Sequence, residues 1–312
     1  MSQAPHLHWG AEALWQGLEP LLPGISVEVV ARSESTNTRL LDRARQSSGQ
    51  RDSPVTRPGE LDSAHAPERT PLGRRVVDVQ PCLLVAEHQT RGRGRLGRDW
   101  VSSAGASLTF SLSLPLAPLQ WGGLSLAVGL ALAQALDPAD PPRIGQEIGV
   151  EPTALLRIGL KWPNDLWLID GPGRGRKLGG ILIETVSVGE RRMCVVGVGL
   201  NVLPQAIEGL AHGYACLQEI DRQASAPAAL ARVALPLVKA LLRFENDGFA
   251  PLVTAYAQRD LLRGQAVVTT LPEVPQGVAE GVDEQGALRV RSDGLHRVVS
   301  GEVSVRLQTP AP

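Results

Sequence analysis

Arginines and glycines alternate in one loop in the first third of the chain. The segment Gly92-Arg-Gly-Arg-Leu-Gly97 holds Arg93 and Arg95 between glycines, and Arg98 follows directly. Glycine lets the backbone approach a ligand closely, and arginine supplies a planar, permanently charged group with several donors. This arrangement suits an anion such as a triphosphate or a carboxylate. Taken by itself, however, the loop is more typical of a solvated basic turn than of a binding site.

The same loop matches the Gly-x-Gly-x-x-Gly pattern of dinucleotide-binding folds. In those folds the pattern has to open a helix. Here Arg98-Asp-Trp-Val101 follows the last glycine, and then a strand pattern begins at Ser107. We therefore do not expect a nicotinamide site.

Two further segments carry polar residues that could act in chemistry. In Lys161-Trp-Pro-Asn-Asp165, Pro163 fixes one backbone angle and so aims Asn164 and Asp165. A carboxylate there could hold Mg²⁺ beside phosphates, or the segment could be an Asn-Asp turn that caps itself. Lys177 begins an apolar strand. Such a lysine is usually a surface charge, and it matters only if other cations and a carboxylate converge on it.

Small polar residues stand before the first predicted helix. Ser35, Thr36 and Asn37 could simply cap that helix. Exposed hydroxyls and an amide at one helix start also suit a cyclic urea, which has both donors and an acceptor. Gln89 could add an amide contact to such a site.

The order of these motifs resembles that of the biotin–protein ligases. The resemblance is carried by Ser35–Asn37, Glu87–Arg98, Lys161–Asp165, Lys177–Glu184 and Gly197–Val202. Each motif is weak alone, but all of them in this order are a strong signal. The likeness extends over nearly all of residues 26–307 apart from the insertions.

The resemblance implies a role for each matched residue. The implied biotin-binding residues are Ser35, Thr36, Asn37, Gln89, Arg93, Gly94, Arg95 and Lys177. The implied nucleotide-binding residues are Arg93, Arg95, Arg98, Trp100, Asn164, Asp165 and Asn201. Arg93, Arg95 and Lys177 would be the catalytic cations. Asp165 would either bind Mg²⁺ or position the nucleotide. Trp100 would either line the binding site or pack in the hydrophobic core.

The implied reaction uses ATP to convert biotin to biotinyl-5′-AMP. The biotinyl group then passes to a lysine of a biotin carboxyl carrier protein of acetyl-CoA carboxylase or a related carboxylase. An anion attacking a polyanion is repelled, so fixed cations and Mg²⁺ would lower the barrier. Two alternatives stay open: a lipoate- or octanoate-protein ligase of the same fold, and a regulator that binds the adenylate without transferring it. The chain could act as a monomer or a homodimer.

The composition is that of an ordinary globular protein. Its 312 residues are 43% hydrophobic and carry a formal net charge of -1, so no bulk basicity indicates nucleic-acid binding. No signal peptide is evident, and the apolar stretch Trp121–Leu136 is shorter than the roughly 20 residues of a membrane span. We predict a buried helix there and no membrane association. The three scattered cysteines favour a reducing compartment, so we expect a cytoplasmic protein.

The expected fold is α+β: a mixed β-sheet flanked by helices, resembling class II synthetases, with a small C-terminal SH3-like β-barrel. We expect an N-terminal extension at 1–25, a catalytic domain at 26–261 and the barrel at 262–312. Within the catalytic domain, residues 46–75 are proline-rich and lack aromatics, which predicts a mobile insertion. The regulatory members of the family carry an N-terminal DNA-binding domain of roughly 60 residues. The extension is too short for one, so we expect neither repressor function nor DNA binding.

Hydrophobic periodicity predicts the elements. The expected helices are Thr38–Arg45, Trp121–Leu136 and Pro227–Arg259. The expected strands are Ser26–Ala31, Leu83–Ala86, Ser107–Leu114, Ile158–Lys161, Leu166–Ile169, Leu178–Val186, Arg192–Val198, Gln265–Thr270, Gly277–Val282, Ala287–Arg291 and Arg297–Leu307.

Overall fold

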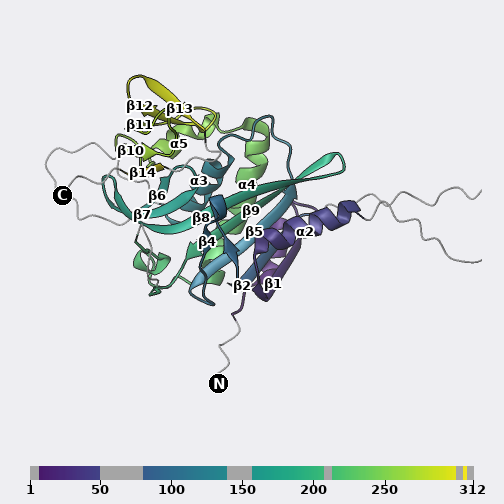
Figure 1. Cartoon of the computed structure of the whole chain (residues 1–312). Helices are drawn as coiled ribbons and strands as arrows, with labels where there is room; N and C mark the ends of the chain where they lie inside the picture. The colour runs from purple at the N-terminus through teal and green to yellow at the C-terminus, as the bar shows by residue number, and fades with distance from the viewer. Residues whose placement is uncertain (1–6, 50–79, 139–156, 207–212, 300–304, 308–312) are drawn as a thin grey trace, which may run out of the picture.

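A seven-stranded mixed sheet forms the centre of the larger domain (Figure 1). The computed structural model describes residues 7–49, 80–138, 157–206, 213–299 and 305–307. The strand order is β1-β2-β5-β9-β8-β7-β6; β1 and β2 run parallel, and the other neighbours are antiparallel. The strands are β1 (Ser26–Ser33), β2 (Cys82–Gln89), β5 (Ser107–Pro115), β6 (Arg157–Lys161), β7 (Asp165–Gly171), β8 (Arg174–Val188) and β9 (Arg191–Asn201).

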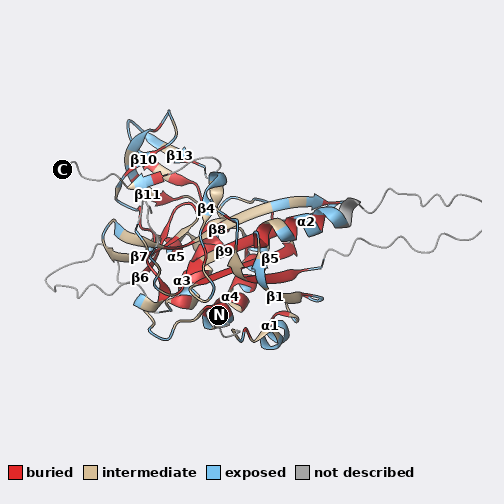
Figure 2. Ribbon diagram, turned by 60° about the horizontal axis from the view of Figure 1, so that its bottom comes forward, coloured by how far each residue is buried: buried red, intermediate tan, exposed pale blue. Residues whose placement is uncertain are grey.

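Helices cover both faces of this sheet. They are α1 (Ala11–Leu18), α2 (Thr36–Gly49), α3 (Leu124–Leu136), α4 (Ala226–Asp247) and α5 (Val253–Ala257). Because successive side chains of a strand point to opposite faces, β2 serves two cores. Leu83 and Val85 join the large core with α3 and α4, whereas Leu84 joins a smaller cluster beneath α2. The buried strands lie between the two helical layers (Figure 2).

Most of helix α3 is buried, as the apolar run predicted, and Gln134 is its exposed residue. It begins at Leu124, after Gly123 adopts a positive φ of 81°, rather than at Trp121. Within the part of the chain that the structure describes, no helix has the length and apolar character needed to cross a membrane. The predicted helical region Pro227–Arg259 divides into α4 and α5. Ser225 caps α4 by accepting a hydrogen bond from the Ala228 amide at 3.3 Å.

The C-terminal strands form a separate antiparallel sheet in the order β13-β12-β11-β10-β14. They are β10 (Ala266–Thr269), β11 (Gln276–Val282), β12 (Leu288–Arg291), β13 (Leu295–Val298) and β14 (Val305–Leu307). The single strand predicted at Arg297–Leu307 is wrong, because β13 ends at Val298 and β14 begins at Val305. Among the described residues, no pairing closes β13 onto β14. The α+β class with a small C-terminal β-domain is confirmed.

Side chains from β6 and the turn after it join the two sheets. Trp162 donates its indole N–H to the Gly286 carbonyl at 3.0 Å, and the Lys161 ammonium donates to the Val305 carbonyl at 2.9 Å. Both donors are buried. The C-terminal sheet is therefore packed directly beside the turn that carries Asn164 and Asp165.

Two segments near the N-terminus differ from the prediction. Helix α2 continues to Gly49, so the first residues of the expected insertion 46–75 are helical. The part of that insertion from residue 50 onward lies outside the described residues. Helix α1 was not predicted, and Leu14 and Leu18 bury its apolar side in the large core. The limits of the three expected domains remain predictions.

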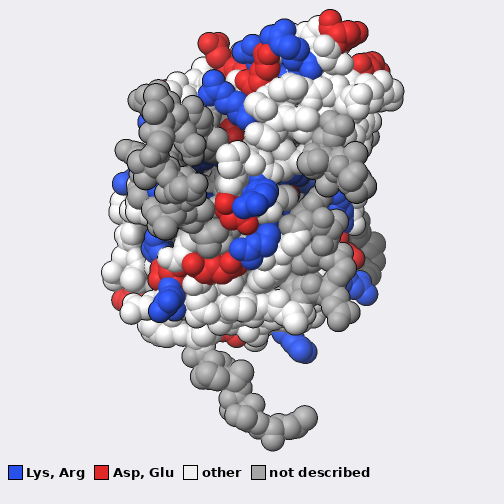
Figure 3. All heavy atoms as spheres, turned by 90° about the vertical axis from the view of Figure 1, so that its left-hand side faces the viewer, with Lys and Arg blue, Asp and Glu red and all other residues white. Residues whose placement is uncertain are grey.

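Acidic and basic side chains are mixed on one face of the molecule. On the face drawn in Figure 3, Lys and Arg lie close to Asp and Glu and form no continuous basic area. This distribution agrees with the formal net charge of -1.

Candidate active site

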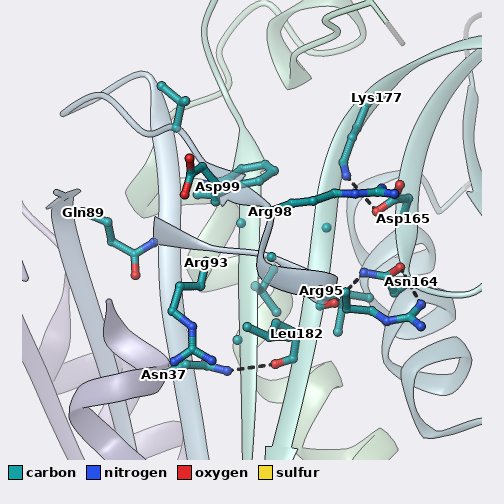
Figure 4. A pocket seen from close by; sticks show the side chains of 18 of the residues that line it. Asn37, Gln89, Arg93, Arg95, Arg98, Asp99, Asn164, Asp165, Lys177 and Leu182 are labelled. Carbon is teal, nitrogen blue, oxygen red and sulfur yellow. Dashed lines mark hydrogen bonds and ion pairs between the residues drawn. The ribbon is translucent and has the colours of Figure 1, made fainter. Parts of the chain in front are cut away.

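One cavity of about 350 Å³ brings together all the residues that the sequence analysis nominated. The nominated residues on its lining are Ser35, Thr36, Asn37, Gln89, Arg93, Gly94, Arg95, Arg98, Trp100, Asn164, Asp165, Lys177 and Asn201. They come from the end of β2, the start of α2, the basic loop (Gly92–Trp100), the β6–β7 turn with the first residue of β7, and strands β8 and β9. Figure 4 shows the loop lying between α2 on one side and the β6–β7 turn on the other.

Glycines in β9 provide the space for the ring and amide that border the cavity. A Cβ at Gly197 would lie 2.8 Å from Cγ of Asn37. A Cβ at Gly199 would lie 2.7 Å from Cζ2 and 2.8 Å from Nε1 of Trp100. Real Cβ atoms essentially never approach so closely, so only glycine fits without displacing these groups. The Gly-x-Gly-x-Asn motif therefore has a steric explanation.

The polar residues at the start of α2 form a closed network. The Thr36 amide and hydroxyl both donate to Oε1 of Gln89, at 2.7 and 3.1 Å. The Ser111 hydroxyl lies 2.6 Å from both the Thr36 hydroxyl and Oδ1 of Asn37. The Asn37 amide donates to the Leu182 carbonyl at 3.1 Å (Figure 4). This end of the cavity is thus held rigidly by hydrogen bonds.

The expectation that these groups are exposed is wrong. Ser35, Thr36 and Asn37 are only 3–4% exposed. Ser111, on strand β5, supplies the polar partner that the buried Thr36 hydroxyl and Asn37 amide require, and the Ser35 hydroxyl accepts from the Thr38 amide at 3.4 Å. They still line the cavity, but as ordered groups with protein partners.

Glu184 ties the basic loop to α2. One carboxylate oxygen accepts from the Arg93 guanidinium at 2.6 Å, and the other accepts from the Asn37 amide at 3.0 Å. Arg93 also donates to the Thr38 hydroxyl at 2.9 Å. Glu184 ends the motif Lys177–Glu184, from which no role was predicted for it. Strand alternation places it on the same face of β8 as Leu182, which lines the cavity.

The basic loop folds as a narrow ribbon with a tight end. Strand β3 (Gly92–Arg93) pairs with β4 (Asp99–Trp100), and a short 3₁₀ turn covers Arg95–Gly97. Leu96 adopts a left-handed φ of 57°, which costs about 1–2 kcal/mol for a residue other than glycine. The loop opens no regular α-helix, in agreement with the rejected dinucleotide prediction. Arg95 at its tip donates to Oδ1 of Asn164 at 3.2 Å.

Positive groups surround Asp165 at the opposite end of the cavity. The Lys177 ammonium lies 2.9 Å from Oδ1 of Asp165 (Figure 4). Burial lowers the pKa of Arg95, and Asp165 acts in the opposite direction. Lys177 was expected to matter only if a carboxylate and further cations converge on it, and the structure provides both.

Lys161 is a buried cation just behind this cluster. Desolvation lowers its pKa to about 8, against an opposing effect of Asp165. Its ammonium lies 5.2 Å from the centroid of the Trp167 ring, within the range of a cation–π contact. Lys161 was quoted in a motif without a role, and it does not line the cavity.

Asn201 and Trp100 are engaged mainly with the protein. The Asn201 amide donates to the carbonyls of Lys177 and Ala215, at 3.2 and 3.0 Å, and so fastens the segment that includes Tyr214 against β8. The Trp100 ring rests against Gly199. Its buried indole N–H has no hydrogen-bond partner among the described residues.

Several lining residues had no predicted role, although some of them stand within the motifs quoted above. They are Asp99, Val101, Phe110, Gly180, Ile181, Leu182, Gly197, Val198, Gly199, Gly213, Tyr214 and Arg306. Arg306 comes from β14 of the C-terminal sheet, so no local pattern could associate it with motifs more than a hundred residues away. Gly197 and Gly199, in contrast, could have been assigned a role from their alternation along β9.

Comparison with protein families matches two parts of the chain. The biotin/lipoate A/B protein ligase family matches residues 79–201, and the biotin protein ligase C-terminal domain matches residues 264–306. The solved biotin protein ligase from Aquifex aeolicus, in complex with biotin and ATP, superposes with a TM-score of 0.62 at 24% identity. That alignment covers 92% of this chain and 100% of the Aquifex chain, and it shows the shared fold.

Curated relatives extend over most of the chain. The biotin–[acetyl-CoA-carboxylase] ligase of Mycobacterium tuberculosis is 33% identical over 287 residues, which cover 90% of this chain and 89% of the relative. The bifunctional ligase/repressor BirA of Escherichia coli is 32% identical over 292 residues, covering 91% and 75%. At this identity and coverage, the chain belongs to the biotin–protein ligase family.

Proposed function

We propose that this protein activates biotin with ATP to biotinyl-5′-AMP and transfers the biotinyl group to a lysine of a biotin carboxyl carrier protein. The observation that carries the proposal is the convergence of all the nominated residues on one cavity. One end of that cavity offers an ordered set of hydroxyl and amide groups, and the other offers clustered cations. A ligand with a polar neutral ring and an anionic tail matches both ends.

The first step joins two anions. An oxygen of the biotin carboxylate attacks the α-phosphorus of ATP, the bond to the β-phosphate oxygen breaks, and pyrophosphate leaves. Repulsion between the carboxylate and the triphosphate dominates the barrier, and fixed positive groups lower it most where charge builds up. Arg93, Arg95 and Lys177 are the proposed catalytic cations. Their placement along the lining supports this role.

The two ends of the cavity divide the binding roles. We assign the biotin ring to the network of Thr36, Asn37 and Gln89, because a cyclic urea matches ordered hydroxyl and amide groups. Ser35 and Gly94 border the same end. The nucleotide is assigned to the region of Asn164, Asp165 and Asn201, beside Arg98 and Trp100.

The basic loop is the proposed cover of the adenylate. Arg93 is bonded toward α2 and Arg95 toward the β6–β7 turn, so the loop is fastened at both walls of the cavity. Biotinyl-5′-AMP is a mixed anhydride that water can hydrolyse. A closed loop keeps water out until the acceptor lysine arrives. That amine then attacks the acyl carbon, loses a proton, and displaces AMP.

Magnesium is proposed to enter with the nucleotide. Among the described residues, no cluster of three or more His, Cys, Asp or Glu side chains could hold a metal ion. A single carboxylate such as Asp165 still fits Mg²⁺, since this ion is commonly held by one or two carboxylates together with substrate phosphates. When bound, Mg²⁺ would supply positive charge at the leaving pyrophosphate. Lys177 would then share Asp165 with the ion.

The acceptor follows from the relatives. The Mycobacterium tuberculosis and Paracoccus denitrificans relatives are both named as biotin–[acetyl-CoA-carboxylase] ligases. We therefore propose the carrier domain of acetyl-CoA carboxylase or a related carboxylase as the acceptor. A cytoplasmic location is part of the same proposal. Whether the enzyme works as a monomer or a homodimer is not fixed by it.

The test mixes the purified protein with biotin, MgATP and an isolated carrier domain, and then measures the carrier by mass spectrometry. We expect a mass gain of one biotinyl group that requires ATP and falls sharply in Arg93→Ala. Arg91→Ala is the matched control, because Arg91 is exposed immediately before the basic loop, outside the cavity lining.

Two other results would contradict parts of the proposal. Pyrophosphate release without carrier modification would show adenylate synthesis with a different acceptor. No reaction with biotin, but transfer of lipoate, would favour the lipoate alternative. The names of the relatives do not favour that outcome.

A further inference from the structure

Lys161 is a buried charge that the proposed chemistry does not use. It ends β6, is 7% exposed, and does not line the cavity, although Asn164 and Asp165 in the same motif do. Burying an ammonium group is costly unless hydrogen bonds compensate for its lost hydration. An apolar side chain of similar length could also pack on Trp167. Stability alone therefore gives no reason for a lysine at this position.

The partner of Lys161 lies in the other domain. Its ammonium donates to the Val305 carbonyl at 2.9 Å, and that contact is buried. Val305 belongs to β14, which pairs with β10 through Thr269↔Val305 and Val268↔Arg306. The carbonyl that accepts this hydrogen bond belongs to the peptide unit that joins Val305 to Arg306. Lys161 thus holds the peptide group immediately before Arg306.

Residues 305 and 306 point in opposite directions. The Val305 side chain is 3% exposed within the large hydrophobic core. Arg306 lines the cavity. This division follows from the alternation of side chains along a strand. The position of the Arg306 guanidinium therefore depends on the peptide that Lys161 holds.

We propose that Lys161 is a positioning residue for nucleotide binding: it anchors the Val305–Arg306 peptide and thereby holds Arg306 at the cavity, against the phosphates. This inference rests on the proposed function, because it takes ATP as a ligand of the cavity. A guanidinium suits phosphate oxygens because it can donate to two of them at once. Lys161 itself touches no substrate and acts only through Arg306.

A double-mutant cycle tests this coupling. The variants are Lys161→Met, Arg306→Gln and the double variant; methionine keeps an unbranched stem for packing on Trp167 but lacks the ammonium group. Pyrophosphate release gives the KM for ATP, and calorimetry without nucleotide gives the affinity for biotin. We expect each single variant to raise the KM for ATP roughly tenfold, on the scale of a lost charged hydrogen bond. Biotin affinity should change less than about twofold.

The double variant gives the decisive value. If Lys161 acts through Arg306, the double variant should have a KM for ATP less than about twofold above that of Arg306→Gln alone. Lys161→Arg, which keeps a cationic donor, should restore part of the affinity for ATP. Lys239→Met, at an exposed position on α4, is the control and should behave like the wild type. Should Lys161→Met fail to fold, Lys161→Gln serves in the same cycle.

The outcomes separate this inference from the proposed function. Effects that multiply in the double variant, or an equal loss of biotin affinity, would overturn the role of Lys161. A wild-type protein that releases no pyrophosphate from ATP with biotin would instead contradict the proposed function.

Discussion

Replacing Gly199 by alanine should disturb nucleotide binding through Trp100. The added methyl would lie within 3 Å of three atoms of the indole, and all of its nearest neighbours belong to that one ring. The ring must move by roughly 1 Å to restore ordinary contact, and overpacking of this kind costs about 1–3 kcal/mol. Because Trp100 belongs to β4 and β4 pairs with β3, the displacement should reach the basic loop.

The expected effect is a fall of roughly five- to hundredfold in kcat/KM for ATP, measured by pyrophosphate release with saturating biotin. Gly17→Ala is the matched control, since a methyl there meets nothing within 4 Å. The key comparison is Gly199→Ala in a Trp100→Ala background. There the methyl has lost the ring it would strike, so it should add little. A full additional loss in that background, or no loss in the wild-type background, would refute the steric explanation.

Three further variants test other parts of the site and fold. In Glu184→Gln, the new side chain can accept a hydrogen bond from only one of the two donors, Arg93 and Asn37. We expect the KM for biotin to rise about three- to tenfold; the rise is limited because solvent screens the charge of the half-exposed Arg93. Glu190→Gln, at an exposed position, is the control and should leave the KM for biotin unchanged. Asp165→Asn should raise the Mg²⁺ concentration that gives half-maximal adenylate synthesis. A lower KM for ATP in this variant would contradict a role in binding Mg²⁺ and would show that Asp165 serves only as the counter-ion of Lys177. Burial raises the pKa of Asp260 to about 6 from 3.8, so the folded protein holds this proton more tightly and the free energy of unfolding falls as pH rises through that interval. Asp260→Asn should therefore increase the free energy of unfolding by about 2–3 kcal/mol near pH 8 and leave it unchanged near pH 4, as measured by urea unfolding. Equal increases at the two pH values would show that ionisation of Asp260 is not the cause.

The sequence was most informative where one strand or turn carries its own signal. Alternation located β5 to within one residue, because its apolar side chains face the large core. The apolar run located α3, because most residues of this helix are buried. The order of the motifs indicated which residues would meet, and the structure places all of them on one cavity.

Features that depend on distant partners could not be predicted. The burial of Thr36 and Asn37 requires Ser111, which follows them by more than seventy residues. Arg306 reaches the cavity only because the C-terminal sheet packs beside β6. Helix α1 is short, and its stability comes from packing against the large core rather than from its own sequence.

The most direct test of the central claim is a single-turnover chase. The protein is incubated with labelled biotin and MgATP, freed of small molecules, and then mixed with the carrier domain. We predict that biotinyl-5′-AMP is recovered from the protein before the chase, and that one AMP is released for each biotinyl group found on the carrier. A carrier that gains biotin with no adenylate on the enzyme, or an adenylate that never reaches the carrier, would contradict the account.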